Sequence, residues 1–223
     1  MSPPKRVPRA TATVAGQIHG PWATTGTAVA AQTDYAVYNG SGQVMPLNLA
    51  ASTQDTWTNA ANTYTVNATQ TLNATRTITA LRNTLAAGSI TLATGSNLQT
   101  YGVLNGAAAL TIVPGTGGVL TTPAGGGNLF LTTGAGTMSV SAPINDNGGA
   151  VTVVKSGTGG TLTLSSTAST FSGGLVINAG TVSIAADTNL GATTGDITFD
   201  GSGGITTTAA VALPAGRTIT INN

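Results

Sequence analysis

Apolar and hydroxyl-bearing residues alternate along most of this chain, and breaks rich in glycine or proline separate the alternating stretches. The apolar pairs of these stretches are Ile90/Leu92, Leu110/Ile112, Leu129/Leu131, Met138/Val140, Val151/Val153, Leu162/Leu164, Val182/Ile184, Ile197/Phe199, Val211/Leu213 and Ile219/Ile221. Successive side chains of a strand point to opposite faces, so each stretch predicts a strand with one buried and one solvent-facing side. Glycine in the breaks allows the positive φ of tight corners. The sequence therefore predicts an all-β protein.

The spacing of these stretches constrains how the strands are arranged. They begin near residues 90, 110, 129, 151, 162, 182, 197 and 219. Most intervals are about 20 residues, typical of one coil of a parallel β-helix, and the shortest fits half a coil. A β-sandwich also has turns at regular intervals, so the spacing alone leaves both architectures open.

The stretch 155–184 joins short alternating segments through two glycine turns, and its motif resembles a known repeat. It is similar to the passenger-associated transport repeat, also called the autotransporter-associated β-strand repeat, of large bacterial surface proteins. The matching positions are Lys155, Gly157, Thr161, Leu162, Leu164, Ser165, Phe171, Gly173, Gly174, Ala179, Gly180, Thr181 and Val182. Two departures are visible: Gly159-Gly160 makes the first turn one glycine longer, and Phe171 stands where tyrosine is commoner.

The resemblance implies a right-handed parallel β-helix, or β-solenoid, and the strand spacing predicts coils of about 20 residues. It also implies an extracellular or cell-surface location, and it brings no catalytic residues. The match is best over residues 150–223 and weak before about residue 85. We expect three parts: a mobile basic and proline-rich arm at 1–15, an irregular cap or connecting segment at 16–55, and the solenoid at 56–223.

Composition is consistent with a folded chain whose surface is polar but uncharged. Only 6% of the residues are charged, the net charge is +1, hydrophobic residues make up 40% and the mean hydropathy is +0.22. Disorder normally accompanies low hydrophobicity and high net charge. The apolar runs are too short for a transmembrane helix, and the absence of cysteine excludes disulfides and thiolate chemistry.

The first twenty residues carry no recognisable export signal. The stretch 10–20 is interrupted by polar residues, whereas a signal peptide needs a continuous apolar core. We expect any export signal to lie upstream, to have been removed or to be of another type. Lys5, Arg6 and Arg9 precede a nearly neutral chain, which argues against nucleic-acid binding.

Three aromatic residues of the segment 16–55 are the candidate ligand contacts. Trp22, Tyr35 and Tyr38 either cover the end of the rod or form an aromatic platform for a sugar. The expected partner in the second case is a cell-surface glycan or protein.

Residues suited to catalysis are sparse. His19 has no partner for a metal site or a catalytic triad, and no phosphate-binding loop is present, so we expect no cofactor and no metal. A carbohydrate-active lyase or hydrolase would need clustered acids. Asp196 and Asp200 lie on one side of a strand, and Asp146 and Asp187 join them only if the coils align. Each of the four also fits a turn or loop.

Threonine-rich rows raise a third hypothesis, an ice-binding solenoid. The rows are Thr77-Ile-Thr79, Thr161-Leu-Thr163 and Thr218-Ile-Thr220. They do not recur in every coil and the coil length varies, so a regular array is not expected. We expect a non-enzymatic stalk or adhesin-type passenger segment of a surface or secreted protein. Its final strand, with no polar cap, is expected to continue into a longer parent chain or to associate end to end.

Overall fold

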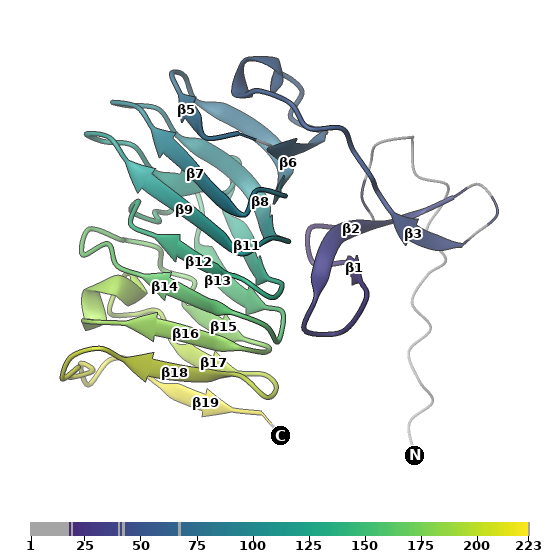
Figure 1. Cartoon of the computed structure of the whole chain (residues 1–223). Coiled ribbons are helices and arrows are strands. Elements are labelled where there is room, and N and C mark those ends of the chain that lie inside the picture. Colours follow the sequence, from purple (N-terminus) through teal and green to yellow (C-terminus); the bar gives the residue numbers. More distant parts are fainter. Residues whose placement is uncertain (1–17, 19, 40, 42, 67, 223) are drawn as a thin grey trace.

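The computed structural model describes residues 18, 20–39, 41, 43–66 and 68–222. Stacked parallel strands form a β-solenoid of about 7 turns with about 22 residues per turn, and the described chain contains no α-helix (Figure 1). The predicted all-β class and solenoid architecture are confirmed. The predicted arm at 1–15 lies outside the described residues, as do Lys5, Arg6, Arg9 and His19.

Two parallel sheets form most of the solenoid wall. The sheet behind in Figure 1, called the back sheet, contains β4 (Thr63–Val66), β6 (Arg76–Asn83), β8 (Leu98–Asn105), β10 (Leu120–Thr121), β11 (Gly127–Thr133), β13 (Val151–Ser156), β15 (Leu175–Ile177), β17 (Ile197–Phe199) and β19 (Ile219–Ile221). The front sheet contains β5 (Gln70–Leu72), β7 (Ala87–Leu92), β9 (Ala109–Pro114), β12 (Thr137–Val140), β14 (Thr161–Leu164), β16 (Thr181–Ile184) and β18 (Gly204–Thr207).

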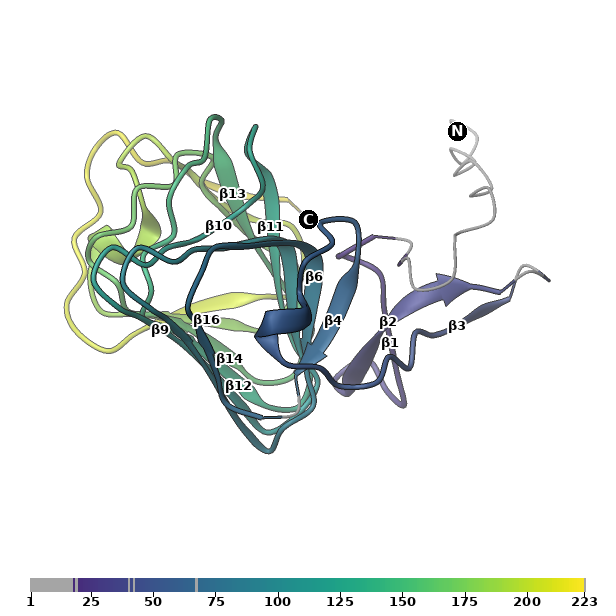
Figure 2. The same cartoon turned by 90° about the horizontal axis from the view of Figure 1, so that it is seen from above.

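A third, mostly irregular side closes each coil and gives the solenoid the triangular outline of Figure 2. It includes the 3-10 helix η2 (Asp187–Leu190), and an isolated parallel bridge joins Leu120 to Ile144. The front strands run to the left and the back strands to the right as the chain descends in Figure 1, so the coil is right-handed.

In-register stacking builds the core from columns of apolar side chains. In the front sheet Ile90 pairs with Ile112, Ile112 with Val140 and Val140 with Leu164. None of these four side chains is more than 3% exposed. The alternating partner residues point outward and are mostly Thr or Ser, because their hydroxyls solvate the outer face without a charge.

The repeat unit differs in detail from the one that the strand spacing predicted. Ile78 of β6 pairs with Thr100 of β8, and the side-chain contacts between these coils also join residues 22 apart. The stretches at 110 and 129 lie in different sheets, so their spacing is not that of one full coil. Varying coil lengths are accommodated in the turns, and the strands keep their register.

One predicted strand is wrong. The pair Val211/Leu213 lies in irregular chain, although its apolar alternation matches that of the true strands. Pro214 follows at once and accepts a hydrogen bond from the Arg217 backbone N–H in a tight turn. The Arg217 side chain then enters the third side of the coil, where its Nε donates to Asp187 at 2.7 Å. The loop is therefore shaped around a buried guanidinium group.

Where an irregular cap or connecting segment was expected, a small antiparallel sheet is present. It contains β1 (Thr24–Gly26), β2 (Gln32–Tyr38) and β3 (Val44–Pro46), and it is called the N-terminal sheet below. It lies beside the solenoid wall and does not cover its end (Figures 1 and 2). The first coil, with the 3-10 helix η1 (Gln54–Thr56), lies at that end.

A charged residue in a core column should open the stack. We predict that Leu162→Asp lowers the free energy of unfolding by several kcal/mol, because Leu162 is 0% exposed and the carboxylate would be buried without a partner. Thr163→Asp, one residue on and facing outward, is the matched control and should change the stability little. Urea unfolding of the two variants measures the difference, and equal losses would contradict the assigned core.

Candidate functional site

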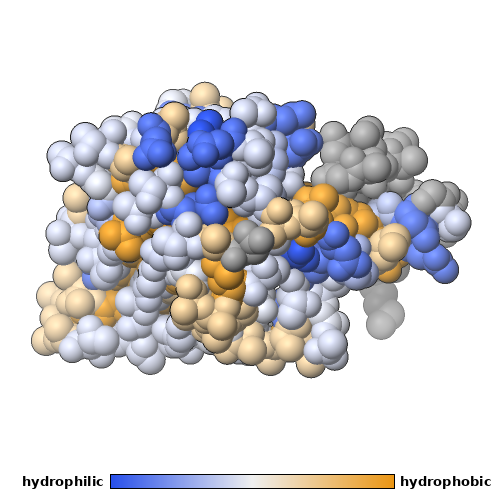
Figure 3. All heavy atoms as spheres, turned by 45° about the horizontal axis from the view of Figure 1, so that its top comes forward, coloured by the Kyte–Doolittle hydropathy of each residue, from blue (hydrophilic) through white to orange (hydrophobic). Residues whose placement is uncertain are grey.

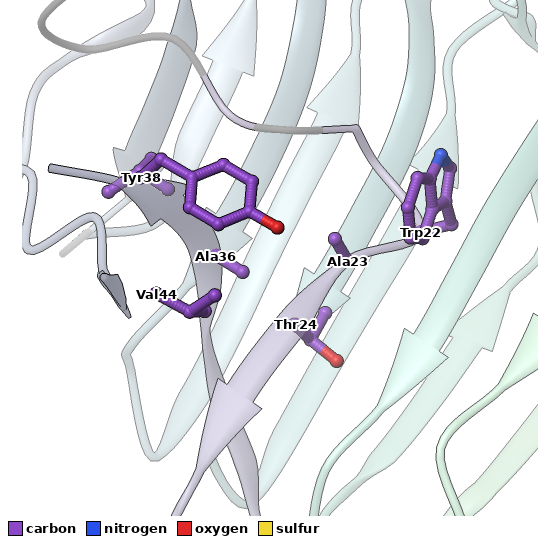
Figure 4. Close-up of a pocket in the computed structure, with 7 residues that line it drawn as sticks. Trp22, Ala23, Thr24, Ala36, Tyr38 and Val44 are labelled. Atoms are coloured by element: carbon purple, nitrogen blue, oxygen red, sulfur yellow. The ribbon is translucent and has the colours of Figure 1, made fainter. Parts of the chain in front are cut away.

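A groove on the N-terminal sheet is a candidate site for ligand binding. Its volume is about 510 Å³, within the usual range for small-molecule sites. The lining residues are Trp22, Ala23, Thr24, Ala36, Val37, Tyr38 and Val44. Figure 4 shows Trp22 and Tyr38 at opposite ends of the groove, with the smaller side chains between them. Trp22 is 54% exposed, so one broad aromatic surface is accessible.

The chemistry of the groove suits a ligand with both apolar and hydroxyl surfaces. Most lining residues are apolar, and the polar side-chain groups of the lining are the hydroxyls of Thr24 and Tyr38 and the indole N–H of Trp22. Among the lining residues that the structure describes, none is charged. The groove is therefore better suited to a neutral sugar or a peptide than to an ionic ligand.

Tyr35 does not belong to this groove. Its side chain points to the opposite face of β2, is 0% exposed, and packs with Ala80 and Leu104 of the solenoid. Its hydroxyl donates a hydrogen bond to the Leu81 carbonyl at 3.1 Å, and burial raises the pKa of this hydroxyl far above its ordinary value. The structure thus brings two of the three candidate aromatics together and uses the third as an anchor.

A buried ion pair fixes the N-terminal sheet to the solenoid. Arg82 of β6 pairs with Asp34 of β2, and both side chains are at most 10% exposed. The Asp34 carboxylate also accepts the backbone N–H groups of Tyr35 and Asn48, at 2.8 and 2.9 Å. Removing one partner of such a pair leaves a buried charge and costs about 3–5 kcal/mol. The orientation of the groove on the solenoid therefore depends on Arg82 and Asp34.

Glycines in the solenoid wall and at its corners let the N-terminal sheet approach closely. A Cβ at Gly106 would lie 2.8 Å from the Thr33 carbonyl oxygen, and one at Gly102 would lie 2.6 Å from Pro21 Cβ. Gly134 and Gly159 face the same segment of chain in the next coils. Side chains at these positions would push the N-terminal sheet away from the solenoid, so this close contact requires glycine.

The motif residue Lys155 is an interior residue with satisfied hydrogen bonds. It stands in the apolar column between Leu131 and Ile177 and is 0% exposed. Its Nζ donates to the carbonyls of Ser156 and Gly157, both at 2.8 Å, and to that of Ala179 at 3.2 Å. The ammonium group thus ties two successive corners together.

The motif glycines make this corner possible. Gly157 and Gly180 have φ values of +82° and +73°, which side-chain-bearing residues rarely adopt. A Cβ at Gly180 would also lie 2.7 Å from Lys155 Nζ. Gly174 has a φ of +83° at the next turn, and a Cβ at Gly173 would meet the Val151 carbonyl oxygen at 2.7 Å.

The remaining motif residues belong to strands and to the core. Leu162, Phe171 and Val182 are each 0% exposed, and Leu164 is 3% exposed. Thr161 points outward from β14. In the described chain, the motif residues therefore act in corner geometry and packing.

Sequence reasoning did not single out Trp57, which closes the first coil. This residue is 1% exposed, and its indole N–H donates to the Ser52 hydroxyl at 3.0 Å. Its ring stacks on Tyr64 with a centroid separation of 6.0 Å. The only sequence signal for a buried Trp57 is its position just before the first strand-like stretch. It has no alternating apolar neighbour, so the periodic pattern does not assign it to the core.

The acids proposed for a lyase or hydrolase are each held by local structure. Asp187 pairs with Arg217 at 2.7 Å, and Asp196 accepts the Thr218 backbone N–H at 2.9 Å. Asp200 accepts from the Asn222 side chain at 3.2 Å. Burial acts to raise the pKa of Asp146, but hydrogen bonds from Ser172 and Val151 outweigh it and hold that pKa below its ordinary value.

Among the described residues, no group of three or more His, Cys, Asp or Glu side chains is placed to hold a metal ion. In the same part of the chain, no helix has the length and apolar character needed to cross a membrane.

Comparison with known proteins adds no relative. A scan against protein-family models, a search of curated proteins and a search of solved structures each found no match.

The buried amine of Lys155 should make the stability depend on alkaline pH. Burial lowers the pKa of Lys155 to about 8, whereas the unfolded chain keeps the ordinary value of 10.5. Between these values the unfolded state holds a proton that the folded state has released, so the free energy of unfolding rises with pH. We predict that wild type gains up to about 3 kcal/mol relative to Lys155→Met between pH 7 and pH 10.

Urea unfolding of both proteins across this range measures the effect. The tyrosines are common to both proteins, so their titration cancels in the difference. A wild-type-minus-variant difference that stays constant with pH, or falls, would contradict a desolvated amine in this corner.

Proposed function

We propose that this chain is a structural segment of a bacterial surface or secreted protein of the autotransporter-passenger type, with no catalytic role. In this proposal the solenoid is a stalk or adhesin body that spaces and presents binding regions. The observation that carries it is the use of the repeat-like motif: Lys155 and its glycines hold corners, and the apolar motif residues fill the core. Because the residues of this motif shape the corners and fill the core, the motif supports a structural function.

The commitment of the acids to local structure supports the non-enzymatic proposal over a lyase or hydrolase. Glycoside hydrolysis needs two carboxyl groups that face one substrate-binding space. Here Asp187 is paired with a guanidinium group, and Asp146 with a serine hydroxyl and backbone N–H groups. Neither residue lines the groove between Trp22 and Tyr38.

The groove is the proposed contact with a cell-surface glycan or protein. Its rigid attachment through Arg82 and Asp34 would present the groove at a fixed angle to the stalk. At the other end, Ile219 and Ile221 are 51% and 68% exposed. We propose that further coils of a parent chain, or a second copy of this chain, cover these side chains.

Glycan-array binding tests the adhesin form of the proposal. The purified chain should bind a subset of neutral glycans saturably, and Trp22→Ala and Tyr38→Ala should each abolish binding because each removes one end of the groove. Tyr101→Ala, a 36% exposed aromatic residue of β8, is the matched control and should bind as wild type does. Far-UV circular dichroism verifies that every sample is β-folded.

Folded wild-type protein that binds no glycan would overturn the adhesin form and leave a passive stalk. Cleavage of an array glycan by the wild type would overturn the non-enzymatic proposal as well.

A further inference from the structure

The outer face of the front sheet carries a regular array of small hydroxyl side chains. One continuous column, given by the pairing of β7, β9, β12, β14, β16 and β18, is Ser89, Thr111, Ser139, Thr163, Ser183 and Thr206. A parallel column two residues earlier includes Thr137, Thr161 and Thr181. We call these two columns the hydroxyl face.

The regularity of this face is a property that the sequence did not reveal. Rows of threonine do not recur in every coil, and the coil length varies. The pairing nevertheless places a Ser or Thr at the same position of six successive strands, because the extra residues of longer coils lie in the turns. Of the three threonine rows in the sequence, only Thr161-Leu-Thr163 belongs to this face, since Thr77 and Thr220 lie in the back sheet.

The hydroxyl face lacks the anchors that macromolecular partners need. Its six strands, as the structure describes them, contain no charged and no aromatic residue. The N-terminal sheet lies to one side and leaves the face uncovered (Figure 1). In Figure 3 strongly hydrophilic residues lie at the top and on the right of the molecule, while the front below is pale with scattered hydrophobic patches. Protein interfaces depend on buried aromatic or arginine anchors, and sugar sites on concave pockets.

Several hydroxyls of the face are available to water. The side-chain hydroxyls of Ser89, Ser139 and Thr163 make no hydrogen bond to any other residue that the structure describes. Ser183 is only 8% exposed, and its hydroxyl likewise has no partner among those residues, although the side chain points outward between Thr163 and Thr206. The hydroxyls of these residues are therefore left to hydrogen-bond with water.

The spacing of these groups would order water in two dimensions. Neighbouring strands repeat at about 4.8 Å, and hydroxyls two residues apart along a strand repeat at about 6.6 Å. Each hydroxyl offers one donor and two acceptor positions, and the threonine methyls beside it restrict the orientation of first-shell water. Charged side chains would impose hydration shells of their own, and the strands of this face have none.

We propose that the hydroxyl face binds ice, with crystalline water as its ligand. The outer face of the sheet holds first-shell water in a repeating net, and this net joins the surface layer of a growing crystal. This activity is separate from ligand binding at the groove, because the two surfaces lie on different sheets.

Thermal hysteresis and inhibition of ice recrystallisation test the proposal with the purified chain. Wild type should hold the freezing point below the melting point and should shape growing crystals. Thr163→Lys places an ammonium group in the middle of the face and should remove both effects. Thr198→Lys, at an outward position of the back sheet with similar burial, is the matched control and should keep them. Thermal melting confirms that both variants are folded.

Folded wild type that shows neither effect would overturn the proposal. So would equal losses in Thr163→Lys and Thr198→Lys, because the effect would then be independent of the face. Loss of glycan binding in Trp22→Ala with ice activity intact is the expected pattern, and it separates this proposal from the function proposed for the groove.

Discussion

In-register hydrogen bonding between each strand and the strand one coil earlier is the interaction on which the rest of the structure depends. No single coil can bury its apolar residues, so each contributes one level to columns such as Ile90–Ile112–Val140–Leu164. The same register sets the hydroxyl columns outside. A change in coil length is tolerated where it falls in a turn, whereas a one-residue shift within a strand would exchange the inner and outer faces.

At the corners of the coils, backbone carbonyl groups point away from the strand ladders and need other hydrogen-bond donors. Different side chains supply these donors in different coils. Asn83 donates to Asn105, and Asn105 donates to the Thr137 carbonyl at 2.7 Å. Lower down, the Lys155 ammonium group binds three carbonyls, and near the last coil Arg217 binds the Gly195 carbonyl together with Asp187. Lys155 and Arg217 thus supply donors where backbone carbonyls would otherwise lack partners.

Local alternation was sufficient to predict the all-β class and much of the core, as at Leu162 and Leu164, whereas the solenoid architecture was predicted only with the help of the repeat resemblance. It failed at Val211 and Leu213, where Pro214 and the buried Arg217 side chain override the pattern. For the candidate site, composition indicated the aromatic cluster, but only the pairing of β2 with its neighbours separates Tyr35 from Trp22 and Tyr38. The regular hydroxyl face was also out of reach, because its residues are far apart in the sequence and become neighbours only through stacking.

A distance measurement along the front sheet tests the stacked register most directly. The chain has no cysteine, so the pair Ser89→Cys and Thr206→Cys can carry two spin labels without other changes. These positions are separated by five ladder steps. Pulsed electron–electron double resonance should therefore give a narrow distance distribution between the labels, consistent with a Cα separation of about 24 Å. A broad distribution, or a narrow one centred well outside the range that the labels allow around this value, would contradict the in-register solenoid.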